Sequence, residues 1–88
     1  MRARVLTLVS RPGCHLCQEM RAVIEQALPA DQFTLEERDV RSDPELERRY
    51  LLEIPVLLAG EREVVRHRVT GGELCARLAA LGLLSPVA

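Results

Sequence analysis

The fold of this chain is decided by residues 11–17, which read Arg11-Pro12-Gly13-Cys14-His15-Leu16-Cys17 and separate an apolar run from a segment of helical periodicity. Residues three apart on a helix face the same way, with Cβ atoms about 5 to 6 Å apart. A disulfide needs Cα atoms about 4.4 to 6.8 Å apart, so Cys14 and Cys17 can form one with little backbone movement. The stretch therefore predicts a dithiol at the start of a helix.

The predicted position of Cys14 favours its ionised form. The first turn of a helix has unpaired backbone N–H groups and the positive end of the helix dipole, and both stabilise a thiolate. A thiol with a pKa of about 8.5 is a few per cent ionised at pH 7, whereas a pKa of about 7 makes it half ionised. We expect Cys14 to be the reactive, solvent-facing cysteine and Cys17 to face the core.

The first half of the chain predicts two strands around one helix. Val5–Val9 is an apolar run typical of a strand that is covered on both faces, and we expect this strand over residues 3–9. An apolar stripe at helical spacing follows over residues 16–28, and Pro29 ends it. Residues 33–40 are half charged, which is typical of a strand at a sheet edge.

The second half predicts a helix, a hairpin and a last helix. Ser42 with Glu45 three residues later predicts a capping box, and Pro44 suits the first turn of a helix. Gly71 and Gly72 interrupt the chain before the last helix. The expected elements are a helix from Ser42 to Tyr50, strands over 56–59 and 63–66 joined through Gly60, and a helix over 73–81 that Gly82 ends.

This order of strands and helices defines the expected architecture. The two early crossovers through helices imply parallel strand pairing, and the later hairpin implies antiparallel pairing. We predict an α/β fold of the type βαβαββα, with a mixed four-stranded sheet flanked by three helices. One domain over residues 1–88 accounts for the whole sequence.

The composition argues against nucleic acid and membranes as partners. The formal charge is -1, and Phe33 and Tyr50 are the only aromatic residues among 88. No apolar run approaches the ~20 residues of a membrane span, and the run after the basic N-terminus is shorter than the roughly 7 to 15 residues of a signal peptide. We expect a cytoplasmic monomer. In that compartment a close cysteine pair is more often catalytic or metal-binding than structural.

A metal site is the main chemical alternative to a redox dithiol. Cys14, Cys17, His15, His67 and Cys75 include enough ligand types for zinc. A structural zinc site normally has a second close ligand pair, whereas His67 and Cys75 are far apart on different predicted elements. We therefore expect no bound metal, a Cys75 side chain packed in the core, and a solvated His67.

Three motifs together resemble the thioredoxin fold, and specifically its small glutaredoxin-like proteins. They are Cys14-x-x-Cys17 after the first strand, Ile54-Pro55 at the start of the third strand, and Gly71-Gly72 before the last helix. Asp43-Pro44-Glu45-Leu46 adds to the similarity with the short glutaredoxin-like branch. The resemblance covers almost the whole chain. It implies a thiol–disulfide oxidoreductase with a cis Ile54–Pro55 bond beside the dithiol.

The resemblance assigns roles around the cysteines. Cys14 is the expected nucleophile and Cys17 the resolving thiol, and His15 adds positive charge nearby. Arg11 matches a basic position that in glutaredoxins helps to hold a glutathione carboxylate, although a plain surface charge explains it equally well. No bound cofactor is expected. Glutathione is a candidate co-substrate, and glutathione or a reductase would return the electrons.

Further substrate contacts are expected from residues later in the chain. The Ile54 backbone would accept an extended substrate segment, and Pro55 would shape the site, unless Pro55 merely begins a strand. Gly71 and Gly72 would bring backbone N–H groups close to a glutathione carboxylate, unless they only form a turn.

The chain also departs from the glutaredoxin pattern in three places. His15-Leu16 replaces the usual Pro-Tyr between the cysteines, Glu53-Ile54 replaces Thr-Val, and Glu73 stands near the position of an Asp. The expected substrate is a protein disulfide or a glutathione mixed disulfide. The alternative functions are a non-catalytic redox-sensing or adaptor module and a small metal carrier.

Overall fold

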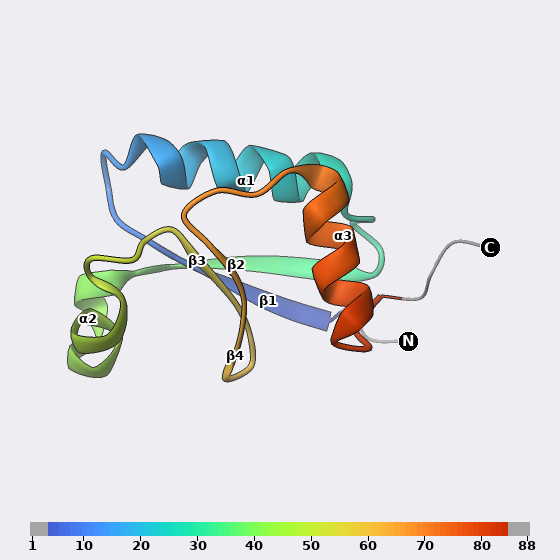
Figure 1. Ribbon diagram of the computed structural model, residues 1–88. Coiled ribbons are helices and arrows are strands. Elements are labelled where there is room, and N and C mark those ends of the chain that lie inside the picture. The colour runs from blue at the N-terminus through green and yellow to red at the C-terminus, as the bar shows by residue number, and fades with distance from the viewer. Residues whose placement is uncertain (1–3, 85–88) are drawn as a thin grey trace.

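The computed structural model describes residues 4–84, which form one sheet with helices on both faces (Figure 1). The elements in chain order are β1 (Arg4–Ser10), α1 (His15–Ala27), β2 (Phe33–Asp39), the 3₁₀ helix η1 (Val40–Ser42), α2 (Pro44–Tyr50), β3 (Val56–Ala59), β4 (Arg62–Arg66) and α3 (Gly71–Ala80). The predicted order of strands and α-helices is confirmed. Among residues 4–84, no helix is both long and apolar enough to cross a membrane.

The sheet has the strand order β2-β1-β3-β4, so β1 is central and β2 and β4 are the edges, as predicted. The strands β1 and β2 are parallel, but β3 is antiparallel to β1, with Val56 opposite Val9. The prediction of a second parallel crossover is therefore wrong. The helix α2 has seven residues and lies at one end of the sheet, so the chain re-enters the sheet at the end where it left (Figure 1).

The two faces of the sheet carry separate apolar clusters. The face under α1 and α3 is built around β1 side chains such as Leu6 and Leu8, which contact Met20 and Ile24 of α1. On the opposite face, Val9 packs in one cluster with Tyr50 of α2 and with buried residues of β3. Side chains alternate along a strand, so the unbroken apolar run of β1 supplies both clusters. This burial fixes the strand that leads into residues 11–17.

The start of α2 differs from its prediction. Asp43, and not Ser42, is the N-cap, and its carboxylate accepts the N–H of Glu45 at 2.8 Å. The Ser42 hydroxyl donates instead to the Asp39 carbonyl at 2.7 Å. Asp and Ser are comparable caps, so local propensity does not choose between two adjacent candidates. The position of Pro44 in the first turn is confirmed.

Candidate active site

The two cysteines lie at the N-terminus of α1, where the chain leaves β1. The turn between β1 and α1 passes through Gly13, whose φ of +78° is a conformation that favours glycine. Cys14 is the N-cap of α1 with extended backbone, and Cys17 lies in the first helical turn. Their Cα atoms are 5.2 Å apart and their sulfur atoms form a disulfide, as the spacing predicts.

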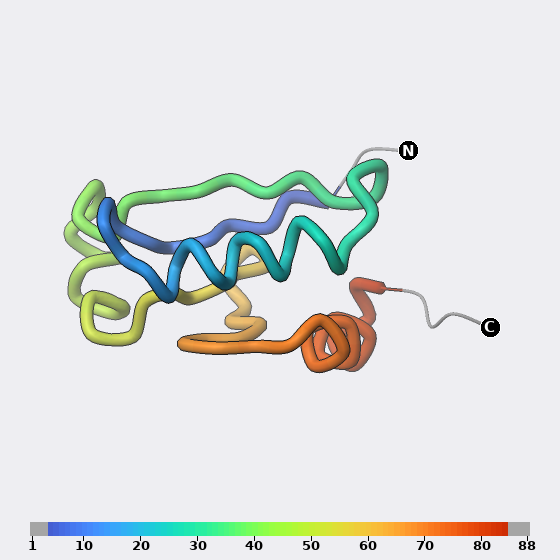
Figure 2. Tube along the Cα trace, turned by 90° about the horizontal axis from the view of Figure 1, so that it is seen from above, coloured from blue at the N-terminus to red at the C-terminus, as the bar shows by residue number. Residues whose placement is uncertain are grey.

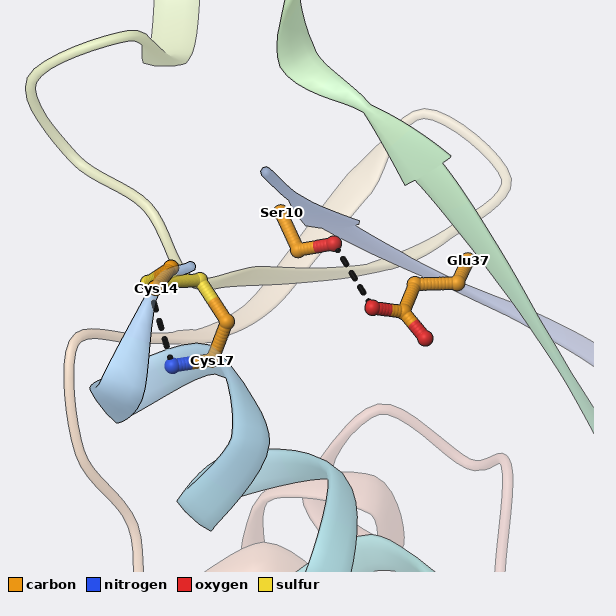
Figure 3. Close-up of a disulfide and its surroundings, with 4 residues drawn as sticks. All are labelled: Ser10, Cys14, Cys17 and Glu37. Atoms are coloured by element: carbon orange, nitrogen blue, oxygen red, sulfur yellow. Dashed lines mark hydrogen bonds between the residues drawn. A yellow bond between two sulfur atoms is a disulfide. The ribbon is translucent and has the colours of Figure 1, made fainter. Parts of the chain in front are cut away.

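The helix N-terminus supplies the electrostatic environment of Cys14. The N–H of Cys17 donates to the Sγ atom of Cys14 at 3.2 Å (Figure 3). The first turn of α1 contains no acidic residue, so no carboxylate within that turn offsets the positive end of the helix dipole. Cys14 is half-buried, whereas Cys17 is only 2% exposed. The predicted division between an accessible sulfur and a core-facing sulfur is confirmed.

The predicted cis Ile54–Pro55 bond is present at the same end of the sheet as the cysteines. Pro55 is buried and directly precedes Val56, which pairs with Val9 near the end of β1. The Pro55 carbonyl accepts the N–H of His67 at 2.8 Å. Ile54 is half-buried in the segment that leads to this bond. Both residues therefore lie at the sheet end from which α1 begins.

A groove of about 510 Å³ runs between α1 and β2 beside the disulfide. Both cysteines and Arg11 line it, and a hydrogen-bonded network joins its walls. The hydroxyl of Ser10 donates to Glu37 Oε2 at 2.9 Å (Figure 3), and Arg21 Nη1 donates to Glu37 Oε1 at 2.7 Å. No sequence pattern predicts this network, because its members lie on three different elements.

Arg21 holds the network together from α1. Its Nε donates to Glu25 at 2.8 Å, and this bond, followed by the charge of Glu37, raises the pKa of Arg21 above its ordinary value. Ser10 is 3% exposed and is the buried polar side chain of β1, so its bond to Glu37 satisfies a group that would otherwise be costly to bury. The network therefore ties the end of β1 to α1 and β2 around the dithiol.

The chain is similar to known proteins over most of its length. A family model described as glutaredoxin-like domain (DUF836) matches residues 5–79. The chain belongs to this family. A glutaredoxin-like protein from Dictyostelium discoideum is 32% identical over 73 residues, which is 74% of this chain and 66% of that protein, just under two thirds of its length.

A structural similarity agrees with the family match. The X-ray structure of a structural-genomics target protein from X. campestris superposes with a TM-score of 0.71 at 32% identity, over 85% of this chain and 96% of that one. The fold of this glutaredoxin-like protein is therefore thioredoxin-like, as expected. The family and the Cys14–Cys17 pair point to a redox-related function.

The paired glycines lie far from the cysteines of this glutaredoxin-like protein. A Cβ atom placed on Gly71 would be 3.4 Å from the Cβ of Ala27, the last residue of α1. Ala27 follows Cys14 by thirteen residues, which is about 20 Å along a helix. Gly71 and Gly72 therefore lie at the other end of α1 from the dithiol. That their N–H groups bind a glutathione carboxylate stays a prediction.

The paired glycines are not a turn before the helix. Gly71 and Gly72 are the first two residues of α3, and Thr70 is its N-cap. The chain reaches this point because the segment after β4 runs along α1 before α3 begins (Figures 1 and 2). The sequence signal for this placement is the capping box formed by Thr70 and Glu73.

His67 is part of a second polar cluster, which holds the cis-proline segment. It has a φ of +67°, and its side chain is exposed to solvent, as predicted. Its Nε2 lies 2.8 Å from Glu53 Oε2. Arg66 Nη1 donates to the same Glu53 oxygen at 3.0 Å and also bonds Glu63. The bond from Arg66 lowers the pKa of the Glu63 carboxyl. The sequence signal for this cluster is Glu53, an acidic residue directly before Ile54-Pro55.

The remaining candidate residues are Arg11, His15 and Cys75. Arg11 is exposed at the rim of the groove that both cysteines line. His15 is also exposed, and its Nε2 lies 3.9 Å from Glu19. Cys75 is half-buried on α3 and packs against the core, as predicted. Within the described part of the chain, no three His, Cys, Asp or Glu residues are grouped to bind a metal ion.

Proposed function

We propose that this protein is a thiol–disulfide oxidoreductase in which Cys14 is the nucleophile and Cys17 the resolving thiol. The observation that carries the proposal is the position of Cys14 as the cap of α1, with its sulfur accepting the Cys17 N–H at 3.2 Å. After reduction of the disulfide, this N–H and the helix dipole stabilise a Cys14 thiolate. Membership of the glutaredoxin-like family supports the same reaction class.

The positions of the two sulfur atoms support a two-step thiol–disulfide exchange. The Cys14 thiolate attacks one sulfur of the substrate disulfide, forms a mixed disulfide and releases the other sulfur as a thiolate. Cys17 then attacks the Cys14 sulfur, and its proton passes to the departing substrate sulfur. The Cys14–Cys17 bond forms, the second substrate thiol leaves, and two electrons have passed from the dithiol to the substrate. The disulfide in the structure is the product state of this sequence.

Two features beside the dithiol support the partners that we propose. Ile54, preceding the cis bond, offers backbone groups for an extended substrate segment, and Arg11 offers positive charge at the rim of the groove. We propose a cytoplasmic, monomeric enzyme without a bound cofactor. A reductase or glutathione would return the electrons to the oxidised dithiol.

The proposal is tested by reduction of a protein disulfide with dithiothreitol as the electron source. We expect the wild-type protein to accelerate the reaction above the dithiothreitol background. Cys14→Ser should abolish this acceleration, and Cys17→Ser should accumulate a mixed disulfide on Cys14 that mass spectrometry detects. If wild-type protein gives only the background rate, the function fails and a redox-sensing module becomes the better interpretation. Cys75→Ser is the matched cysteine control.

A further inference from the structure

A second groove starts at Leu16 in the first turn of α1, on the side of α1 that faces away from β2. It measures about 400 Å³ and lies between α1 and the segment after β4. Its apolar walls are Leu16 and Val23 of α1 and Val69 of the facing segment, all half-buried, over the buried Met20. Charged side chains line its rim. These are Glu19, His67 and Arg68.

Each wall of the groove has one residue that is linked to the proposed reaction site. Leu16 stands between the two cysteines in the sequence and in the first turn of α1. On the opposite wall, His67 is held to the cis-proline segment through its N–H bond to the Pro55 carbonyl. A substrate segment whose cysteine reacts at Cys14 and whose backbone follows Ile54 therefore has a neighbouring side chain within reach of this groove.

Glutathione matches neither the apolar groove nor the distance from Cys14 to the N-terminus of α3. It is a tripeptide, and three extended residues span only about 10 Å. The N-terminus of α3 lies about 20 Å from Cys14 along α1, so a glutathione joined to Cys14 cannot reach it. Glutathione also has no apolar side chain to place against Leu16 and Val69.

Two N–H groups at the N-terminus of α3, those of Thr70 and Glu73, already have partners. The Thr70 hydroxyl accepts the Glu73 N–H at 3.1 Å, and the Glu73 carboxylate accepts the Thr70 N–H at 3.1 Å. The carboxylate offsets the positive end of this helix dipole and repels a second carboxylate. The acidic residue in this first turn therefore makes the start of α3 a poor anchor for a glutathione carboxylate.

We infer that the substrate is a polypeptide disulfide with an apolar residue next to its cysteine, which binds in the groove between Leu16 and Val69, and that glutathione disulfide is a poor substrate. The inference rests on the proposed function, because the groove can affect the choice of substrate only if the dithiol reduces disulfides. Burial of the apolar side chain holds the substrate sulfur close to Cys14, and release of the reduced peptide requires that contact to be broken.

The test measures how fast different disulfides oxidise the reduced protein to its Cys14–Cys17 form. The probes are oxidised glutathione and the symmetric disulfide dimers of two short neutral peptides, with either Leu or Gly on both sides of the cysteine. Acid quenching, alkylation and mass spectrometry give the second-order rate constants. Because burying a Leu side chain is strongly favourable, we expect the Leu peptide to react about tenfold faster than the Gly peptide and glutathione.

Matched variants test whether the groove causes the rate difference between the Leu and Gly peptides. Val69→Ser should reduce the ratio of the Leu to the Gly peptide rate to within about twofold, because less apolar area is left to bury. Val23→Ser, from the opposite wall, should do the same if Val69→Ser is poorly folded. Val5→Ser makes the same chemical change at an exposed valine in β1, outside the groove, and should keep the wild-type ratio.

The outcomes separate this inference from the proposed function. If oxidised glutathione reacts as fast as the Leu peptide, or if both groove variants keep the wild-type ratio, the substrate assignment is overturned and the oxidoreductase remains. If no disulfide oxidises the protein faster than it oxidises free dithiothreitol, the proposed function itself fails.

Discussion

The two longer helices begin with the same backbone geometry and with different chemistry. Cys14 caps α1 and Thr70 caps α3, and both caps have extended backbone. In each case the cap side chain accepts an N–H three residues later, from Cys17 at 3.2 Å and from Glu73 at 3.1 Å. The cap atom is a sulfur in one helix and a hydroxyl oxygen in the other.

The difference in charge decides what each helix start can do. In α3 the Glu73 carboxylate completes a capping box and offsets the helix dipole. In α1 no acidic residue lies in the first turn, so the dipole is left to act on the cap sulfur. One helix start therefore anchors the helix, and the other supports a reactive thiolate. The following predictions test this comparison.

The largest effect is expected on cysteine reactivity. At pH 7 Cys14 of the reduced protein should be alkylated about tenfold faster than Cys75, because Cys14 has a helix N-terminus to stabilise its thiolate. Timed alkylation followed by peptide mass spectrometry measures both rates. Partial burial also slows Cys75, so the pH midpoint of Cys14 alkylation is measured as well. In urea the two rates should converge, and a persistent difference would remove the helix as its cause.

Removal of the cap of α3 should reduce stability. Thr70→Ala loses the side-chain bond to the Glu73 N–H and should lower the free energy of unfolding by about 1 kcal/mol. Urea denaturation measures this change. Thr70→Ser retains a hydroxyl and should lie close to wild type, so equal losses in both variants would mean that the cap bond contributes little.

Addition of an acidic residue should make α1 resemble α3. His15→Glu places a carboxylate in the first turn, and helix-dipole energies of 0.3–1 kcal/mol correspond to a rise of about 0.2 to 0.7 pH units in the midpoint of Cys14 alkylation. His15 is exposed, so the substitution should leave the fold intact. His15→Gln is the neutral control. A midpoint that stays constant in His15→Glu would contradict the electrostatic account of Cys14.

The smallest effect is expected at the third cysteine. Cys75 lies within α3, outside the reacting pair, so Cys75→Ser should change disulfide-reducing turnover by less than about twofold. The protein-disulfide assay described above measures it, with urea denaturation as a check on packing against the core. A large loss of turnover with unchanged stability would give Cys75 a redox role and weaken the contrast between the two helices.

Much of the fold and of the dithiol was predictable because it depends on local properties. The apolar run of β1, the helical stripe of α1 and the spacing of Cys14 and Cys17 each lie within one continuous segment. The cis Ile54–Pro55 bond needed the family resemblance, since only about 5 to 6% of X–Pro bonds in folded proteins are cis. Ser42 shows the limit of local reasoning, because the adjacent Asp43 is an equally good cap.

The sequence by itself determined the dithiol at the start of α1 and the strand that leads into it, because both depend on residue spacing and periodicity within a short segment. Only the tertiary structure decided that β3 is antiparallel, that Glu37 bonds Ser10 and Arg21, and that Gly71 packs beside Ala27. These contacts join distant segments. Their geometry depends on where α2 returns the chain and on how far the segment after β4 extends along α1, and no local pattern specifies either.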